Sequence, residues 1–187
     1  LNMISQLNKH LAGLENPHTG EVVNYDGGKS LEENQLDAIN MVKAVIDVVN
    51  PTNILEIGFN RGSSALTFLL SSTAKVTSID IQEKPGSVKY LNEQFPDRFT
   101  FILGNSQELD LSAYKDVDLV FIDGDHSYEG ILKDTAQVLE ISPKYILYDD
   151  YEHPLHGPDV KRVIDQFPQM EFVKSYFNQA LFKIKHV

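Results

Sequence analysis

Residues 54–64 read Ile-Leu-Glu-Ile-Gly-Phe-Asn-Arg-Gly-Ser-Ser, and they contain the strongest structural signal in the chain. The run opens with apolar residues around a single glutamate, as expected for a strand that is buried on both faces. Gly58 and Gly62 let the backbone turn sharply and approach a ligand closely, and a helical pattern follows them. A strand, a glycine turn and a helix together predict a ligand site at the carboxyl end of a parallel strand.

The glycine spacing differs from that of the dinucleotide-binding loop. That loop needs Gly-x-Gly-x-x-Gly, whereas Asn60 stands at the second glycine position, so a nicotinamide or flavin ligand is disfavoured. Asp80 ends the next apolar run, roughly 20 residues further on, where an acid binds ribose hydroxyls in nucleoside-binding α/β proteins. Each signal alone fits an ordinary turn or strand end. Together they indicate a nucleoside ligand.

Apolar runs and helical patterns alternate along the rest of the chain, which predicts parallel strands joined by helices. The last two strand patterns flank Asn178-Gln179 with no helix between them, as in a hairpin. We therefore predict an α/β fold with a Rossmann-like, doubly wound, seven-stranded, mostly parallel sheet and a C-terminal antiparallel hairpin. The expected strands are 54–58, 75–81, 99–103, 117–122, 145–148, 172–176 and 180–184, and the expected helices between them are 62–71, 85–95, 127–140 and 158–167.

A further helix precedes the first strand. Ser30 and Glu33 read as a capping box, and apolar residues follow at helical spacing until Asn50-Pro51. A chain of 187 residues is expected to form one domain. We assign residues 1–50 to an N-terminal helical and lid segment and residues 51–187 to the ligand-binding domain. Residues 14–30 fit a disordered N-terminal tail as well as they fit a lid over the ligand.

Composition excludes several classes of protein. The chain has no cysteine, which excludes disulfides, thiolate metal sites and cysteine nucleophiles. It has 16 Lys and Arg against 27 Asp and Glu, and this acidic balance argues against nucleic-acid binding, which depends on clustered basic residues. No apolar run approaches the roughly 18–20 residues of a membrane span. We expect a cytoplasmic protein that acts on a small molecule, with no nucleic-acid or membrane partner.

Carboxylates follow the fourth and fifth expected strands. Asp123 ends the fourth strand, Asp125 lies in the loop after it, and Asp149-Asp150 ends the fifth. Neighbouring strands lie about 4.8 Å apart, so these carboxylates can converge and raise one another's pKa. A hard divalent cation such as Mg²⁺ would resolve the repulsion. The alternative is that these acids cap helices or face solvent, and that Asp123 only contacts a cofactor.

His126 lies in the same loop, three residues after Asp123. An imidazole there could take a proton from a hydroxyl group near neutral pH. The plainer alternative is an exposed loop histidine. Two further histidines, His153 and His156, either line the ligand pocket or belong to a polar loop, and Tyr128 either contacts substrate or packs on the next helix.

Together these motifs resemble the class I S-adenosylmethionine-dependent methyltransferases over about residues 50–185. The segment 56–62, with its acid and two glycines, is similar to the first motif of that family. Asp80 looks like the acid that holds the ribose, and residues 104–106 are similar to the segment beside the adenine. The resemblance implies S-adenosylmethionine as cofactor. The cofactor-binding residues that it implies are Glu56, Gly58, Asn60, Gly62, Ser63, Asp80, Asn105, Ser106 and Asp123.

Residues 123–129, Asp-Gly-Asp-His-Ser-Tyr-Glu, resemble the subfamily that includes Mg²⁺-dependent sugar O-methyltransferases of antibiotic pathways. The resemblance implies that Asp123, Asp149 and Asp150 hold Mg²⁺ or another divalent cation and that His126 is the catalytic base. The implied reaction is methyl transfer to a hydroxyl of a small molecule. Relatives commonly pair, so a homodimer is a further expectation.

Three alternatives stay open on the sequence. The protein could be a metal-independent methyltransferase of the same fold, an aminopropyl transferase on that fold, or a non-catalytic nucleoside-binding module. The gathering of acids and His126 at one rim weighs against the last, because a scaffold has no reason to assemble them. The strand 117–122 is not followed by the Asn/Asp-Pro-Pro-Tyr run of amino methyltransferases, so nucleobase methylation is not expected.

Overall fold

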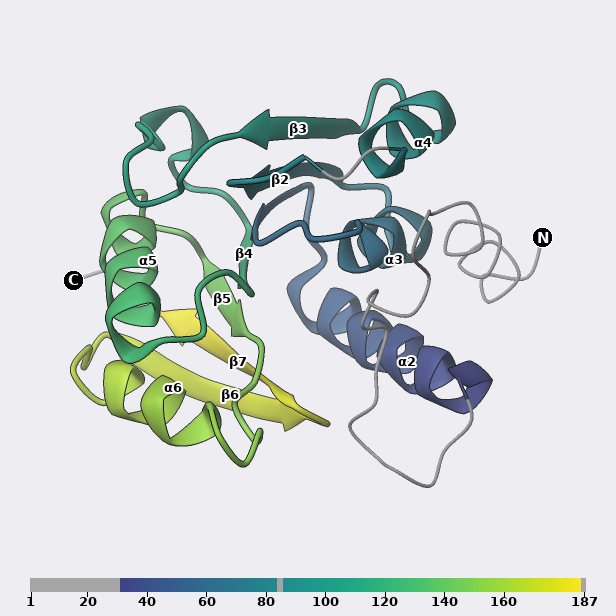
Figure 1. The fold of residues 1–187 in the computed structure, drawn as a ribbon. Helices are drawn as coiled ribbons and strands as arrows, with labels where there is room; N and C mark the ends of the chain where they lie inside the picture. Colours follow the sequence, from purple (N-terminus) through teal and green to yellow (C-terminus); the bar gives the residue numbers. More distant parts are fainter. Residues whose placement is uncertain (1–30, 84–85, 186–187) are drawn as a thin grey trace.

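The strands form a single twisted sheet in the computed structural model, which describes residues 31–83 and 86–185. Their order across the sheet is β3-β2-β1-β4-β5-β7-β6 (Figure 1). β1 to β5 pair in parallel, and β7 lies antiparallel between β5 and β6. This confirms the predicted fold class. The strands are β1 (Asn53–Ile57), β2 (Lys75–Asp80), β3 (Phe99–Leu103), β4 (Leu119–Ile122), β5 (Tyr145–Tyr148), β6 (Met170–Tyr176) and β7 (Gln179–Ile184).

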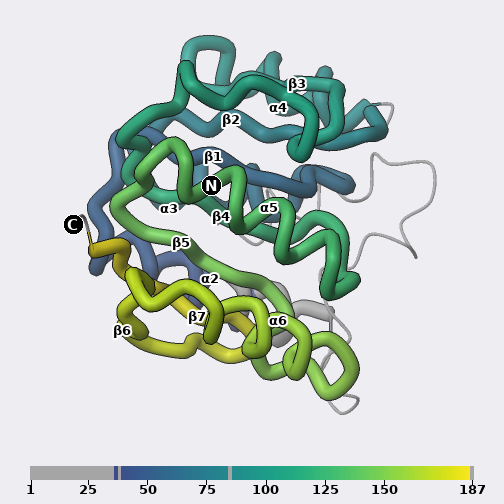
Figure 2. The backbone as a smooth tube through the Cα atoms, turned by 90° about the vertical axis from the view of Figure 1, so that its left-hand side faces the viewer, coloured from purple at the N-terminus to yellow at the C-terminus, as the bar shows by residue number. Residues whose placement is uncertain are grey.

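Helices cover both faces of this sheet. α2, α3 and α4 lie on one side, and α5 and α6 lie on the other (Figures 1 and 2). The connection from β3 to β4 differs from the other connections between parallel strands, because residues 104–118 contain only the short 3-10 turn η2 (Ser112–Tyr114). The helices are α2 (Leu31–Val49), α3 (Ser63–Ser71), α4 (Ser87–Gln94), α5 (Tyr128–Glu140) and α6 (Gly157–Ile164).

Each face of the sheet has its own apolar core, and the strands supply both. Ile54 of β1 packs into the core under α2, α3 and α4, whereas its neighbour Leu55 packs into the core under α5 and α6. Phe121 and Ile122 of β4 divide between the two cores in the same way. Because side chains alternate with a period of two, a strand buried on both faces is apolar along most of its length, and Glu56 is the buried exception in β1.

α2 belongs to the first core and not to a separate body. Ile39, Val42 and Val45 are buried there, and the helix packs against α3. The proposed lid over residues 14–30 and the capping box that starts at Ser30 lie outside the described residues. Among the helices described, none is long and apolar enough to cross a membrane.

Candidate active site

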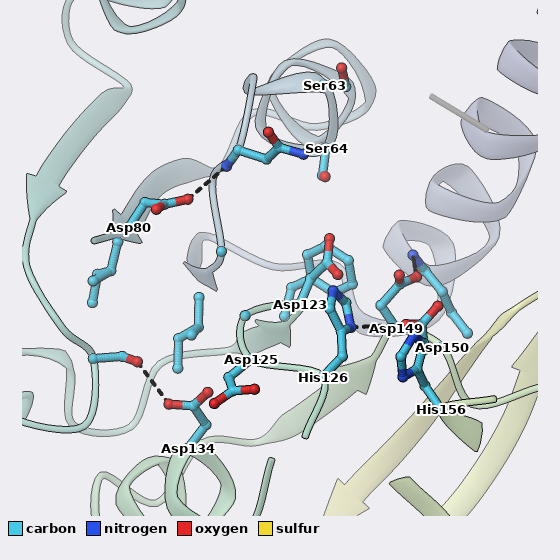
Figure 3. A pocket seen from close by; sticks show the side chains of 18 of the residues that line it. Ser63, Ser64, Asp80, Asp123, Asp125, His126, Asp134, Asp149, Asp150 and His156 are labelled. Atoms are coloured by element: carbon cyan, nitrogen blue, oxygen red, sulfur yellow. Dashed lines mark hydrogen bonds and ion pairs between the residues drawn. The ribbon is translucent and has the colours of Figure 1, made fainter. Parts of the chain in front are cut away.

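A cavity of about 950 Å³ opens where the carboxyl ends of β1, β2, β4 and β5 meet (Figure 3). Asp80 lies on one side of it, while Asp123, His126, Asp149 and Asp150 gather on the other. The structure therefore brings the predicted base and metal ligands together. Of the residues predicted to bind the cofactor, Gly58, Asn60, Ser63, Asp80, Asn105, Ser106 and Asp123 line the cavity, and Glu56 and Gly62 do not.

The glycine turn after β1 lies directly against the end of β4. Gly58 has φ +94°, and a Cβ added to it would lie 1.9 Å from the backbone oxygen of Asp123. Gly62 has φ +80°, and a Cβ there would strike the Phe59 ring at 2.6 Å. Side chains are excluded at both positions by the positive φ and by the close approach. Gly58 thus lets bare backbone line the cavity, and Gly62 lets the turn pack closely on Phe59.

Asp80 has a structural role that the sequence did not predict. Its Oδ2 accepts hydrogen bonds from the backbone N–H groups of Phe59 at 2.9 Å and Asn60 at 2.8 Å, and its Oδ1 accepts one from Gln82 at 2.9 Å. Asp80 therefore fixes the glycine turn onto β2. Each carboxylate oxygen has more than one lone pair, so a ligand hydroxyl can still bind to the same side chain.

Two further acids lie near the cavity, on opposite faces of the sheet. Glu56 is fully buried, and burial raises its pKa to about 8 although Ser78 donates a hydrogen bond to it, so this carboxyl is largely protonated at pH 7. Asp134 of α5 is 1% exposed, lines the cavity and accepts a hydrogen bond from Ser106 at 2.7 Å. Sequence reasoning missed Asp134. Its signal was a single acid on the buried stripe of α5, next to residues such as Ile131 and Val138.

Asp123 and Asp149 form a carboxylate pair with little to neutralise it. Enclosure by the protein, followed by the charge of Asp149, raises the pKa of Asp123 well above its usual range. Enclosure and the charge of Asp150 raise the pKa of Asp149 to about 6. Gln179 donates to Asp149 Oδ1 at 2.8 Å. No lysine or arginine lines the cavity within the described part of the chain.

Asp150 holds His126. The distance from His126 Nδ1 to Asp150 Oδ2 is 2.9 Å, and Asn178 donates to the other carboxylate oxygen of Asp150 at 2.9 Å. The hydrogen bond to Asp150 raises the pKa of His126, against the effect of enclosure. Although enclosure alone would raise the pKa of Asp150, the hydrogen bond from His126 lowers it. An ionised Asp150 can only accept, so Nδ1 carries a proton, and in the neutral imidazole Nε2 keeps its lone pair.

The residues that form this site lie within a segment that matches a known protein family. The family model described as a methyltransferase domain matches residues 55–151, which is just over half of the chain and contains the glycine turn, Asp80, Asp123, His126 and the Asp149-Asp150 pair. The chain belongs to this methyltransferase family. Its predicted membership among the class I S-adenosylmethionine-dependent methyltransferases is confirmed by the family match and the fold together.

Solved methyltransferases share the fold along almost all of the chain. A Bacillus cereus O-methyltransferase in complex with S-adenosylhomocysteine is 15% identical, with a TM-score of 0.64, covering 98% of this chain and 90% of its own. TDP-rhamnose 3'-O-methyltransferase of calicheamicin biosynthesis is 17% identical, with a TM-score of 0.59 and coverage of 97% and 92%. N-methyltransferase NodS from Bradyrhizobium japonicum is 12% identical, with a TM-score of 0.63 and coverage of 100% of both chains. At these identities the likeness shows the fold alone. No curated protein sequence matches the chain.

The two other histidines near the site of this methyltransferase line the cavity, whereas Tyr128 does not. The ring of His156 lies 5.1 Å from that of His126 and 4.8 Å from that of His153. Tyr128 packs on α6, where the Arg162 guanidinium lies 4.1 Å from its ring centre, and Gln166, just after this helix, donates to its hydroxyl. Of the two alternatives for each, the structure supports cavity lining for the histidines and helix packing for Tyr128.

The residues predicted to hold a metal in the methyltransferase are neighbours but do not form a ligand set. Among residues 31–83 and 86–185, no group of three or more His, Asp or Glu side chains is arranged to hold a metal ion. Both oxygens of Asp150 are engaged by His126 and Asn178, and Gln179 occupies Oδ1 of Asp149. Metal dependence therefore stays a prediction of the resemblance.

Proposed function

We propose that this methyltransferase transfers the methyl group of S-adenosylmethionine to a hydroxyl group of a small molecule, with His126 as the base. The observation that carries the proposal is the 2.9 Å contact between His126 Nδ1 and Asp150 Oδ2 at the cavity wall. This contact holds the imidazole in one orientation and directs the basic lone pair of Nε2 away from Asp150. It also stabilises the positive charge that His126 acquires when it takes a proton.

The cofactor fits the side of the cavity that is built from the glycine turn and Asp80. We assign the ribose to Asp80 and the adenine to the loop after β3, where Asn105 and Ser106 line the cavity. Asp123, at the boundary between the two sides, would lie near the sulfonium. A cation is favoured there because the described lining carries several aspartates and no basic side chain of the Lys or Arg type. S-adenosylhomocysteine in matched structures supports the same cofactor class.

The reaction follows from this placement. Nε2 of His126 takes the proton of the acceptor hydroxyl while the hydroxyl oxygen forms a bond to the methyl carbon. The bond between that carbon and sulfur breaks, and its electron pair stays on sulfur, which leaves S-adenosylhomocysteine. The methylated acceptor is an ether, and the proton on His126 is balanced by Asp150. Because the methyl donor is already activated, much of the acceleration comes from holding the two reactants in line.

The base favours a hydroxyl over an amine acceptor. Both O- and N-methyltransferases share this fold, so the fold does not choose between them. A neutral amine attacks with its own lone pair and can lose its proton afterwards. A hydroxyl is a poor nucleophile until its proton is removed, which is the step that an oriented histidine accelerates.

The predicted divalent cation is a second candidate feature of the same function. It is supported by the pKa of Asp149, which is raised to about 6, because a carboxylate pair without a cation is destabilised when both members ionise. No step of the proposed reaction passes through the metal. Asp123 and Asp149 are the residues that would hold it.

Titration of S-adenosylhomocysteine into the protein by calorimetry tests the cofactor assignment first. We expect micromolar affinity, and we expect Asp80→Ala to weaken it at least about tenfold because the glycine turn loses its anchor. The matched control is Asp97→Ala, which removes an exposed aspartate that precedes β3 at the opposite end of the strands. Undetectable binding to the unchanged protein would remove the cofactor assignment.

Transfer of a labelled methyl group to a panel of acceptors tests the assignment of a hydroxyl group as the methyl acceptor. The panel should pair each polyol or phenol with its amino analogue, so that only the acceptor atom differs. We expect product from the hydroxyl members. Methylation of amines with no hydroxyl methylated would contradict the role of His126 as a base for hydroxyl acceptors.

A further inference from the structure

The turn between β6 and β7 reaches across the end of β5 and contacts the acids of the site. Asn178 in this turn and Gln179 at the start of β7 are each 7% exposed. Amide side chains at a hairpin turn are normally exposed, so their burial requires partners. Asn178 Nδ2 donates to Asp150 Oδ1 at 2.9 Å, and Gln179 Nε2 donates to Asp149 Oδ1 at 2.8 Å.

The backbone is strained on both sides of the Asn178–Asp150 hydrogen bond. Asp150 has φ +58° and Phe177, next to Asn178, has φ +54°. Residues with a Cβ rarely adopt this left-handed conformation, and such strain persists only where surrounding contacts enforce it. The backbone N–H of Glu152 also points to the backbone oxygen of Asn178 at 3.4 Å. The loop after β5 and the hairpin turn are therefore joined at this point.

We propose that Asn178 is a positioning residue that acts on the base through Asp150. By engaging Oδ1 of Asp150, it fixes the rotation of the carboxylate so that Oδ2 meets His126 Nδ1 at 2.9 Å. That contact in turn determines which nitrogen of His126 carries the proton and where Nε2 points. The inference rests on the proposed function for its catalytic consequence, but the chain of hydrogen bonds itself can be tested without any turnover.

Gln179 provides a matched comparison within the same turn. It makes the same kind of hydrogen bond over a similar distance, but to Asp149, which does not bond to His126. A change at Gln179 should therefore leave the protonated nitrogen of His126 unchanged. Ser175, an exposed residue of β6 in the same hairpin, serves as a control for general effects on the turn.

Nitrogen NMR of the His126 imidazole tests the positioning directly. In the unchanged protein the neutral ring should carry its proton on Nδ1. In Asn178→Leu, which keeps the size of the side chain but removes the donor, we expect the population to shift toward the Nε2–H form that free histidine prefers. Gln179→Leu and Ser175→Ala should leave it unchanged. An unaltered spectrum of His126 in a folded Asn178→Leu protein would overturn the proposal, and Asn178→Ala is the second variant if leucine prevents folding.

A double-mutant cycle tests the catalytic consequence. We expect Asn178→Leu alone to lower kcat about tenfold, while the KM of the acceptor and the affinity for S-adenosylhomocysteine change less than twofold. In a His126→Ala background the same substitution should lower kcat no further, because Asn178 acts only through His126. Multiplicative losses would overturn the proposal. Failure of the proposed function is distinguishable, since it would abolish methyl transfer in the unchanged protein and leave the NMR result intact.

Discussion

β4 has an aspartate at each end, and the two lie in opposite environments. Asp118, just before the strand, accepts hydrogen bonds from Lys144 Nζ and from the backbone and side chain of Thr52. Although burial alone would raise its pKa, these hydrogen bonds and one from the Asn53 backbone lower it to about 2. Asp123, just after the strand, faces Asp149, and its pKa is raised well above the usual range.

This difference indicates that the amino ends of the strands stabilise the fold, whereas their carboxyl ends form a site for a ligand. Asp118 joins the starts of β1, β4 and β5, because Thr52, Asn53 and Lys144 each precede or open one of these strands. At the other end the acids have amide and imidazole partners and no lysine or arginine on the described cavity lining. We infer that the charge left there is balanced when a cationic ligand binds.

The largest expected effect is on turnover at the carboxyl end of β4. His126→Ala should lower kcat at least about 100-fold, because an oriented general base contributes roughly 10²–10⁴ in rate. Affinity for S-adenosylhomocysteine should change less than twofold, since His126 lies on the side of the cavity opposite the glycine turn and Asp80, to which we assign the cofactor. Steady-state kinetics and calorimetry on the same preparation provide both values. Equal kcat in the variant and the unchanged protein would remove His126 from the mechanism.

Asparagine substitutions at Asp118 and Asp149 compare how the two ends of the sheet contribute to the free energy of unfolding. Asp118→Asn should lower it by about 2 kcal/mol. The amide oxygen can still accept from the N–H groups of Thr52 and Asn53, but the amide NH2 then faces Lys144, and the charged hydrogen bond to Lys144 is lost. Its methyl-transfer activity should stay within twofold. Asp149→Asn should leave stability unchanged or raise it by about 1 kcal/mol, and it should reduce activity. Urea unfolding monitored by circular dichroism measures both, and a reversed order of the two stabilities would contradict the comparison.

The pH dependence of stability should show both groups in separate windows. Asp118 has a pKa lowered from 3.8 to about 2, so the stability that it provides is present above pH 4 and is lost as the pH falls toward 2. Asp149 has a pKa raised from 3.8 to about 6, so its ionisation costs stability, and the free energy of unfolding should fall as the pH rises from about 4 through 6. Each change is on the order of 2 kcal/mol, after a discount for solvent screening that applies most to Asp118.

Unfolding curves at several pH values test the two windows, with the same substitutions as matched controls. Asp149→Asn should reduce the slope between pH 4 and 6, where the raised pKa values of Asp123 and Glu56 account for the remainder. Asp118→Asn should flatten the slope between pH 4 and 2. A slope that its own substitution leaves unchanged would assign that slope to other groups.

The smallest expected effect is that of a metal ion. If a divalent cation occupies Asp123 and Asp149, Mg²⁺ added at pH 8 should raise Tm by a few degrees, equivalent to about 1 kcal/mol for a chain of this size. Asp149→Asn should abolish the shift, and a chelator should reduce turnover. No shift, together with turnover that a chelator does not change, would favour the metal-independent alternative and leave the acids for the cofactor itself.

The fold followed from the sequence because its signals are local. Apolar runs, helical spacing and the glycines around Phe59 placed every strand within two residues of its observed bounds. The convergence of Asp123 and Asp149 was also predictable, since parallel neighbouring strands must end at the same edge of the sheet. The lack of a full helix between β3 and β4 was not predicted as such, because the alternation of strands and helices along the rest of the chain suggested a helix in every connection, although no helical pattern was assigned between these two strands.

The partners of each polar side chain were decided only by the tertiary structure. Asn178 reaches Asp150 across 28 residues, Asp134 reaches Ser106 across 28, and Asp80 holds the glycine turn 20 and 21 residues away. Residue spacing and composition do not predict these hydrogen-bonded pairs, because a hydrogen bond depends on side-chain rotation and on how loops from distant strands pack. The sequence by itself determined that the acids ending β4 and β5 and His126 meet at the rim of the sheet. The packing of the hairpin, the loops and α5 brought Asn178, Gln179 and Asp134 to the same cavity and determined which side chains hold one another in place.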